Sequence, residues 1–116
     1  MKLRVGSGGP PVGVYTCRFV GTEKTEHEKW GPGLAFRQEI LDGPQATKIA
    51  SRITGPEPSL TNGCGKMCSA LAGRPLVPGE AFDPDDYIGQ IYIVTVEATD
   101  SGGTRIGSMI KAPEAQ

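Results

Sequence analysis

One helical stretch stands among predicted strands in this sequence: Thr61-Asn62-Gly63-Cys64-Gly65-Lys66-Met67-Cys68-Ser69-Ala70-Leu71. Its apolar residues Cys64, Met67, Cys68 and Leu71 fall at i, i+3, i+4 and i+7, which is the stripe of an amphipathic helix. Thr61 or Asn62 can cap the start of this helix, and Gly73 and Pro75 end it. The stretch therefore predicts a helix of about three turns with one buried face.

Three strands are predicted before this helix. Residues 12–20 are rich in β-branched and aromatic side chains, which are typical of a strand, and residues 21–33 are a polar stretch that predicts a long loop. Residues 34–41 alternate between apolar and charged side chains, and residues 45–54 alternate again. Because Asp42-Gly43 can form a tight turn between these two stretches, they predict a hairpin.

Two strands are predicted after the helix. A loop over residues 74–86, rich in proline and aspartate, leads to residues 87–98, which carry the strongest strand pattern in the chain. Asp100-Ser101-Gly102-Gly103 then turns the chain, and residues 104–110 return as the last strand. The predicted order is strand, strand, strand, helix, strand, strand.

This order predicts an all-β fold with one short helix, the five-stranded Greek-key barrel known as the OB-fold, with its helix between strands three and four. Gly13, Gly21, Gly89 and Gly107 lie in or beside predicted strands, where a strongly coiled barrel needs kinks and bulges. An SH3-like barrel and a small β-sandwich are the alternatives, but neither has a natural place for the helix.

Length and composition indicate one small domain. The chain has 116 residues, of which 37% are hydrophobic. We expect a flexible arm over residues 1–11, a single domain over residues 12–111 and a short tail over residues 112–116. No apolar run is long enough for a membrane helix, and Met1-Lys2-Leu3-Arg4 lacks the apolar region of a signal peptide. We therefore expect a cytoplasmic chain with no membrane partner.

The charges are unevenly distributed although the net charge is only -1. Residues 1–56 carry eight basic and five acidic side chains, whereas residues 57–116 carry four basic and eight acidic ones. The first half can therefore present a basic face to a partner. The alternative is a solvated mixture of charges on both halves.

OB barrels commonly bind single-stranded nucleic acid or oligosaccharide across strands two and three and the loops beside them. Binders of single strands combine cations, which neutralise phosphates, with aromatic rings on which bases stack. On this surface the sequence predicts seven nucleic-acid-binding residues: Lys24, Lys29, Trp30, Arg37, Lys48, Arg52 and Arg105.

Each of these residues also has a structural interpretation. Trp30, among charged and glycine neighbours, is either a stacking platform or a plug that closes the mouth of the barrel. Arg37, Lys48 and Arg52 are expected to share one face of the hairpin, as a track for phosphates or as a merely solvated surface. Tyr15, Phe19, Phe36 and Tyr92 are expected in the core.

Five short segments carry a resemblance: Gly31-Pro32-Gly33, Glu39-Ile40-Leu41-Asp42-Gly43, Ser51-Arg52-Ile53-Thr54, Leu71-Ala72-Gly73-Arg74-Pro75 and Tyr87-Ile88-Gly89-Gln90. With them, the stretch from Trp30 to Val96 resembles small phage-encoded OB-fold proteins that bind single-stranded DNA. The resemblance implies a role in phage-type replication or recombination, in the cytoplasm of the host cell. The chain departs from the bacterial single-strand binders because it lacks a long acidic tail with an apolar tip, so recruitment of partners through such a tail is not expected.

Three cysteines and one histidine limit the other chemistry of the chain. An odd number of cysteines without a signal peptide argues against a disulfide framework. Cys17, His27, Cys64 and Cys68 offer four ligands for zinc, but Cys17 and His27 are ten residues apart and form no tight knuckle. Small buried cysteines on the inner face of the helix are the favoured interpretation, and no metal is expected.

The sequence thus predicts sequence-independent binding of single-stranded DNA. Stacking and charge read no base edges, so no sequence preference is expected. No pair of nucleophile and base is visible, so we expect neither an enzyme nor a cofactor. The alternative is a structural or assembly protein that uses its strand edges or residues 74–86 as contacts, without binding nucleic acid. Whether the protein forms a homo-oligomer is left open.

Overall fold

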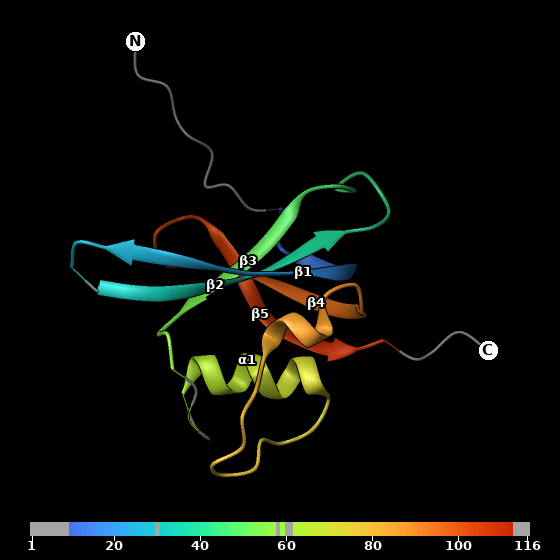
Figure 1. The fold of residues 1–116 in the computed structure, drawn as a ribbon. Helices are drawn as coiled ribbons and strands as arrows, with labels where there is room; N and C mark the ends of the chain where they lie inside the picture. The colour runs from blue at the N-terminus through green and yellow to red at the C-terminus, as the bar shows by residue number, and fades with distance from the viewer. Residues whose placement is uncertain (1–9, 30, 58, 60–61, 113–116) are drawn as a thin grey trace.

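Five antiparallel strands form one sheet, and one short α-helix packs against it (Figure 1). The computed structural model describes residues 10–29, 31–57, 59 and 62–112. Its elements are β1 (Gly13–His27), β2 (Gly31–Ile40), β3 (Ile49–Thr54), α1 (Gly63–Ala72), the 3-10 helix η1 (Pro84–Tyr87), β4 (Ile91–Ala98) and β5 (Thr104–Lys111). The predicted all-β class with one short helix is confirmed, and so is the predicted order of strands and helix.

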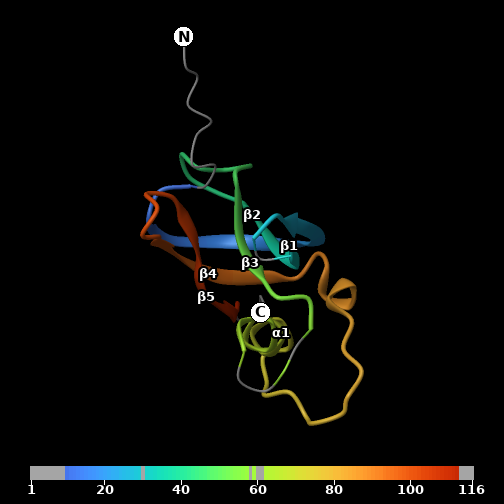
Figure 2. The ribbon, with the colours of Figure 1, turned by 90° about the vertical axis from the view of Figure 1, so that its left-hand side faces the viewer.

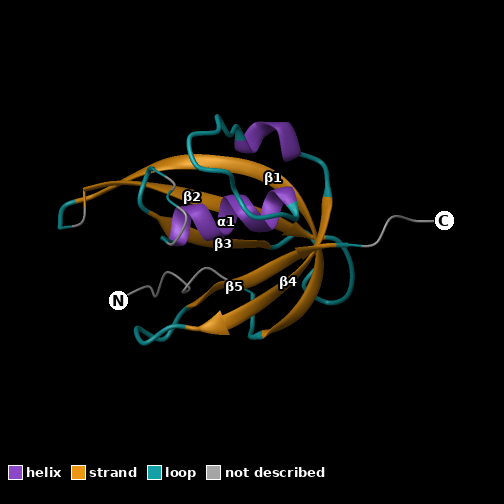
Figure 3. Cartoon of the chain, turned by 90° about the horizontal axis from the view of Figure 1, so that it is seen from below, coloured by secondary structure: helices purple, strands orange, loops and turns teal. Residues whose placement is uncertain are grey.

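The strands lie in the order β3-β2-β1-β4-β5, so the first strand of the chain is the central one. Residues 13–18 of β1 pair with β4, and residues 17–27 pair with β2. β3 and β5 are the two edges, and the sheet is not closed by a backbone ladder between them. α1 lies below the sheet in Figure 1, and in the view from below it is drawn over β2 and β3, with the β4-β5 hairpin to one side (Figure 3).

Local signals in the sequence fix both ends of α1. The Asn62 side-chain oxygen accepts a hydrogen bond from the Gly65 backbone N–H at 2.7 Å, which caps the start of the helix. Gly73 has a φ of 72°, the left-handed conformation that ends many helices, and its N–H donates to the Ser69 carbonyl at 2.9 Å. The predicted cap and stop are confirmed at Asn62 and Gly73, while Thr61 lies outside the described residues.

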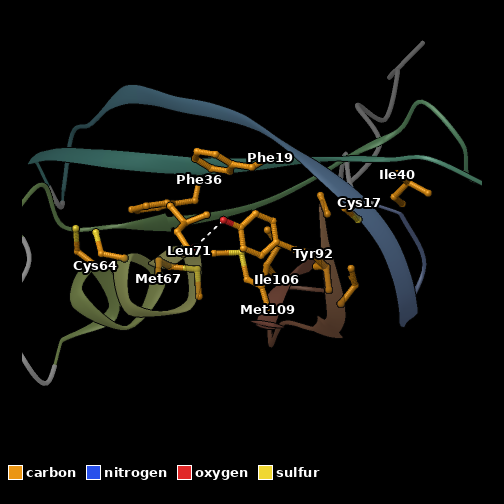
Figure 4. Packing of buried hydrophobic residues seen from close by; sticks show 14 residues of the cluster. Cys17, Phe19, Phe36, Ile40, Cys64, Met67, Leu71, Tyr92, Ile106 and Met109 are labelled. Carbon is orange, nitrogen blue, oxygen red and sulfur yellow. Dashed lines mark hydrogen bonds between the residues drawn. The ribbon is translucent and has the colours of Figure 1, made fainter. Parts of the chain in front are cut away.

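The core lies between α1 and the inner face of the sheet. Cys64, Met67, Cys68 and Leu71 of α1 are all buried, so the predicted apolar stripe and the predicted burial of both helix cysteines are confirmed. The Tyr92 hydroxyl donates to the Leu71 carbonyl at 2.7 Å and ties the end of α1 to β4 (Figure 4).

The four aromatic residues predicted in the core pack there. Phe19, Phe36 and Tyr92 are fully buried, and Tyr15 is partly buried against the same cluster. The hydroxyl of Tyr15 reaches out of the cluster and donates to the Pro11 carbonyl at 2.6 Å.

The prediction of a long loop over residues 21–33 is wrong. β1 continues to His27 and β2 begins at Gly31, so most of this polar segment is a two-stranded ribbon that projects beyond the rest of the sheet (Figure 1). A bulge between Phe19 and Gly21, where Gly21 has a φ of 116°, marks the point at which the ribbon leaves the core. Beyond that point residues 22–27 of β1 are all exposed or partly exposed, so polar side chains suit this part of the strand.

The predicted tight turn at Asp42-Gly43 is also wrong. β2 ends at Ile40 and β3 begins at Ile49, so residues 41–48 form a longer connection. Within it both Gly43 and Thr47 have positive φ values, 77° and 73°, and the Thr47 N–H donates to the Ile40 carbonyl at 2.8 Å. The connection therefore has one left-handed residue near its start, Gly43, and one near its end, Thr47, and it is longer than the two-residue turn predicted at Asp42-Gly43.

The segment between α1 and β4 wraps around the helix, which Figure 2 shows end-on. The Arg74 guanidinium and the Glu80 carboxylate form two hydrogen bonds, of 3.0 and 2.9 Å, and the pKa of Glu80 is lowered to about 2 by them. The predicted strand over residues 87–98 starts later than expected, at Ile91, because η1 takes Tyr87 and a turn follows it, in which the Gln90 N–H donates to the Tyr87 carbonyl at 3.1 Å.

The chain ends are described only in part. Residues 1–9 of the predicted arm and residues 113–116 of the predicted tail lie outside the described residues. Pro10 and Pro11, which the sequence assigned to the arm, both make contacts with the sheet. Pro10 is buried, and its carbonyl accepts a hydrogen bond of 2.8 Å from the Thr104 hydroxyl on β5.

Candidate nucleic-acid interface

A groove of about 770 Å³ crosses β2 and β3 on the face that points away from the core. One wall is the β1-β2 ribbon and the other is the turn between β4 and β5. Its lining residues are Thr25, Glu26, His27, Gly31, Pro32, Gly33, Ser51, Ile53, Thr54, Gly55, Ser101, Thr104 and Arg105.

Gly33, in the wall of the groove formed by the β1-β2 ribbon, has no room for a side chain. A Cβ at Gly33 would lie 2.7 Å from the Thr54 carbonyl oxygen and 2.8 Å from the Thr25 hydroxyl oxygen. Gly31 has a φ of 78°, which also favours glycine. The Gly31-Pro32-Gly33 segment therefore lets β1, β2 and β3 approach one another closely at the groove.

The chemistry of the groove is mostly neutral. Thr25, Ser51, Thr54, Ser101 and Thr104 line it, and hydroxyl groups can both donate and accept hydrogen bonds. Its charged or titratable side chains are Glu26, His27 and Arg105. Among the described lining residues the groove thus offers mainly groups that form hydrogen bonds, with Arg105 as its cation.

Ile53 gives the groove an apolar element. Its side chain is 66% exposed on β3, directly opposite Ala35 of β2. An exposed, rigid β-branched side chain in a groove offers a flat contact for a base or a sugar ring.

Of the predicted site residues that the structure describes, Arg105 is the one that lines the groove itself. It lies at the start of β5, directly opposite Glu97 of β4, and its Nε donates to a Glu97 carboxylate oxygen at 2.9 Å. Both side chains are nearly half exposed, so the contact is a surface ion pair. Such pairs contribute about 0–1 kcal/mol, and a phosphate can replace the carboxylate at little cost.

Arg52 has a different place from the one predicted. Its side chain is only 23% exposed, and Nη1 donates to the Ile106 carbonyl at 3.0 Å and lies 3.9 Å from the Glu97 carboxylate. It therefore joins β3 to β5 across the open seam of the sheet.

Arg37 and Arg52 do not share a face, so that prediction is wrong. Arg37 lies opposite Ser51, and Arg52 lies opposite the buried Phe36, which places the two arginines on opposite sides of the sheet. Arg37 pairs with Glu23 at 3.0 Å on the outer face. The prediction assumed a register without knowing where β3 starts, and a shift by one residue exchanges the two faces.

Three further predicted cations, Lys24, Lys29 and Lys48, are exposed but do not line the groove. Lys24 is exposed on β1 opposite Leu34, and Lys48 is exposed just before β3. Lys29 is exposed directly after β1, and its backbone N–H donates to Nδ1 of His27 at 3.0 Å. Trp30 lies outside the described residues. Lys29 thus lies in the connection between His27 and Gly31, both of which line the groove.

Sequence reasoning missed the neutral lining of the groove. The predicted alternation of residues 45–54 puts Ser51 and Ile53 on one face and Lys48 and Arg52 on the other. Nucleic-acid binding is predicted on the face with Lys48 and Arg52, because cations neutralise phosphates. The exposed Ile53 between polar neighbours was the signal that could have directed attention to the other face.

The three cysteines belong to the core rather than to the groove. Burial, with a smaller effect of Asp42, raises the pKa of Cys17 to about 11. The hydrogen bond between the Cys64 and Cys68 thiols raises the pKa of Cys68, as does burial, so Cys68 keeps its proton. Among the described residues, no group of three metal-ligating side chains converges on one point.

No protein-family model, curated protein or solved structure matches this chain. Within the part of the chain that the structure describes, no helix has the length and apolar character needed to cross a membrane.

Proposed function

We propose that this domain is an OB-fold. The strand order β3-β2-β1-β4-β5, with a helix between β3 and β4, supports this assignment. Arg52 bridges the two edge strands, β3 and β5, at the position where an OB barrel closes. The bulges at Gly21 and beside Val96 provide the bends that a small coiled barrel needs.

We propose that the protein binds single-stranded DNA, without sequence preference, as an accessory of phage-type replication or recombination. One observation carries this proposal. The groove crosses β2 and β3 between the β1-β2 ribbon and the β4-β5 turn, which is where OB-folds hold oligonucleotides and oligosaccharides.

In the proposed complex, cations at the rim hold the backbone of the strand. Arg105 exchanges its Glu97 partner for a phosphate, and Lys29 adds charge next to the groove-lining His27, while Lys24 and Lys48 contribute longer-range attraction from outside the groove. Trp30 stacks on a base, and the hydroxyl groups and Ile53 contact bases and sugars. None of these contacts is a hydrogen bond to the edge of one particular base, so the proposed binding has no sequence preference.

The test is a titration of fluorescent oligo-dT and of a duplex at about 50 and about 200 mM salt. We expect binding to oligo-dT that weakens with salt, and weaker binding to the duplex. Trp30→Ala is expected to cost about 1–3 kcal/mol of binding free energy. Absence of oligo-dT binding at the lower salt concentration would overturn the proposed function, and an unchanged affinity of Trp30→Ala would remove Trp30 from the site.

A matched pair of arginine variants tests the position of the site. Arg105 and Arg18 are equally exposed, at 49% and 48% of the side chain, and each pairs with a glutamate across neighbouring strands. Only Arg105 lines the groove. Arg105→Gln is therefore expected to weaken oligo-dT binding and to reduce its salt dependence, whereas Arg18→Gln is expected to bind like the unaltered protein. Equal effects of the two variants would place the site elsewhere.

A further inference from the structure

The β1-β2 ribbon leaves one edge of β1 unpaired. On the side of β4, residues 13–18 are paired, and the Phe19 N–H still donates to the Gln90 carbonyl at 3.0 Å. Past the bulge at Gly21, residues 22–27 pair with β2 on one side. On their other side, no described residue forms a backbone hydrogen bond with them. We name this side of residues 22–27 the ribbon edge.

The ribbon edge can accept a further strand. An unpaired edge offers its backbone N–H and C=O groups to another extended chain. Residues 22–27 include no proline, so each of them keeps its backbone donor. Their side chains are exposed or partly exposed, and the ribbon projects beyond the other elements (Figures 1 and 3). A two-stranded ribbon is only marginally stable by itself, so added strands stabilise it.

The charges along the ribbon edge indicate which strand fits. Its sequence is Thr22-Glu23-Lys24-Thr25-Glu26-His27. When two copies pair antiparallel with Thr25 opposite Thr25, Lys24 of each copy lies opposite Glu26 of the other, and Glu23 lies opposite His27. Residues directly opposite each other share a face of the sheet, and opposite charges there stabilise the pairing. The ribbon edge is therefore complementary in charge to a second copy of itself.

The neighbouring registers lose this complementarity. Centring the pairing on Lys24 or on Glu26 sets that residue against its own copy, and like charges directly opposite each other are destabilising. Centring it between Lys24 and Thr25 sets Glu23 opposite Glu26. Centring it between Thr25 and Glu26 sets Lys24 opposite His27. The charges thus favour one register, as a specific pairing requires.

Within one copy, the charges of Lys24 and Glu26 have no ion-pair partner among the described residues, whereas Glu23 pairs with Arg37 at 3.0 Å. β2 offers them none, because Lys24 lies opposite Leu34 and Glu26 opposite Pro32. A second copy supplies both partners at once. A strand of another protein would have to carry the same alternation of charges.

We infer that the ribbon edge pairs antiparallel with the ribbon edge of a second copy, about a two-fold axis at Thr25. The two ribbons then form one continuous sheet in the order β2, β1, β1 and β2. Residues 23–27 of each copy are fewer than the roughly 20–30 that each partner contributes to a standard interface, so the dimer forms only at raised protein concentration. The inference does not rest on the proposed binding of DNA.

Sedimentation velocity from micromolar to millimolar concentrations, without nucleic acid, tests this pairing. We expect the protein to shift from its 12.2 kDa monomer toward twice that mass as the concentration rises. Lys24→Glu and Glu26→Lys each set like charges opposite each other, so each variant alone is expected to stay monomeric. An equal mixture of the two variants restores opposite charges at both positions and is expected to form a mixed dimer.

Two further variants complete the test. Lys24→Glu combined with Glu26→Lys in one chain also restores opposite charges, so this double variant is expected to dimerise and serves if a single variant does not fold. Lys66→Glu, at an exposed position on α1, makes the same change in net charge as Lys24→Glu and is expected to dimerise like the unaltered protein.

Four results would each overturn the inference: an unaltered protein that is monomeric at every concentration, a folded Lys24→Glu variant that dimerises by itself, restored charges that give no dimer, or loss of the dimer in Lys66→Glu. Since no oligo-dT is present, a dimer that responds to these variants supports the inference whether or not the protein binds DNA.

Discussion

Gly65 has no room for a side chain, although it lies in a helix where alanine is normally better than glycine. A Cβ at this position would overlap the carbonyl oxygen of Ser59, because the chain before α1 folds back against the first turn. Ser59 is held there by Asn62, whose side-chain oxygen accepts the Ser59 N–H as well as the Gly65 N–H. The cap of the helix and the identity of residue 65 are therefore linked.

Two glycine-to-alanine variants are expected to have opposite effects on stability. Gly65→Ala forces the Ser59 segment away and is expected to cost about 1–3 kcal/mol of unfolding free energy, as overpacking does. Gly63→Ala, two residues earlier, is expected to be neutral or to stabilise by up to about 1 kcal/mol. A Cβ at Gly63 finds its nearest neighbour, a methyl group of Thr54, at an ordinary 3.6 Å.

Urea unfolding of both variants measures the difference. Equal stabilities of Gly65→Ala and Gly63→Ala would show that the segment before α1 yields to the new methyl group without cost.

Single residues also explain why the candidate site was only partly predicted. Arg37, Arg52 and Arg105 look alike in the sequence, but one lies on the outer face, one spans a seam and one lines the groove. The register between β2 and β3 decides among these places, and it depends on where the connection over residues 41–48 ends. The positive charges of the three arginines in the sequence do not show where this connection ends, and so do not show which face each arginine occupies.

At the level of elements, the two edges of the sheet meet without a backbone ladder. Arg52 supplies the polar link between them, from β3 to the Ile106 carbonyl of β5, while Glu97 lies near the same guanidinium. Arg52 is less exposed than Arg37, whose pair with Glu23 lies on the open face of the ribbon. The two arginines should therefore differ in what they contribute to stability.

Arg52→Met is expected to destabilise the protein by about 1.5–3 kcal/mol, the range for hydrogen bonds that involve a charged group. Methionine keeps much of the length and apolar contact of the arginine but has no donor. Arg37→Met serves as the control and is expected to cost about 0–1 kcal/mol, because its ion pair is exposed. Chemical denaturation measures the free energy of unfolding of both variants. Similar losses for Arg52→Met and Arg37→Met would show that the contact between β3 and β5 does not depend on Arg52.

The elements also differ in how well the sequence predicts them. α1 was predicted with its cap and stop because Asn62, the apolar spacing and Gly73 are local signals. The extension of β1 beyond Gly21 was missed because strand patterns are recognised by one apolar face, and residues 22–27 of β1 have none. Its strand conformation comes from pairing with a distant partner, which no short window of sequence reveals.

At the scale of the whole molecule, the buried thiol of Cys17 and the buried phenol of Tyr92 make the free energy of unfolding depend on pH in the alkaline range. Burial, with a smaller effect of Tyr87, raises the pKa of Tyr92 to about 12, and burial raises the pKa of Cys17 to about 11. The folded state thus favours the neutral form of both groups. Their contribution is fully present below the unfolded pKa values, 9.0 for cysteine and 10.0 for tyrosine, and is lost as pH rises toward 11 and 12.

We therefore expect the thermal midpoint to fall progressively above about pH 9. Tyr92→Phe and Cys17→Ala remove one ionisable group each, so their midpoints are lower at pH 7 but decline less steeply with pH. Thermal melts followed by circular dichroism across the alkaline range measure these slopes. Identical slopes for the unaltered protein and both variants would assign the alkaline loss to other groups.

The central place of β1 in the sheet has a consequence for how the chain reaches this fold. β1 and β2, and then β2 and β3, are neighbours in sequence and can pair soon after they form. The pairing of Gly13 with Val96 must instead close a loop of most of the chain. Because such closure is slow, we expect folding to wait for β4, with the apolar side of the first three strands transiently open to aggregation.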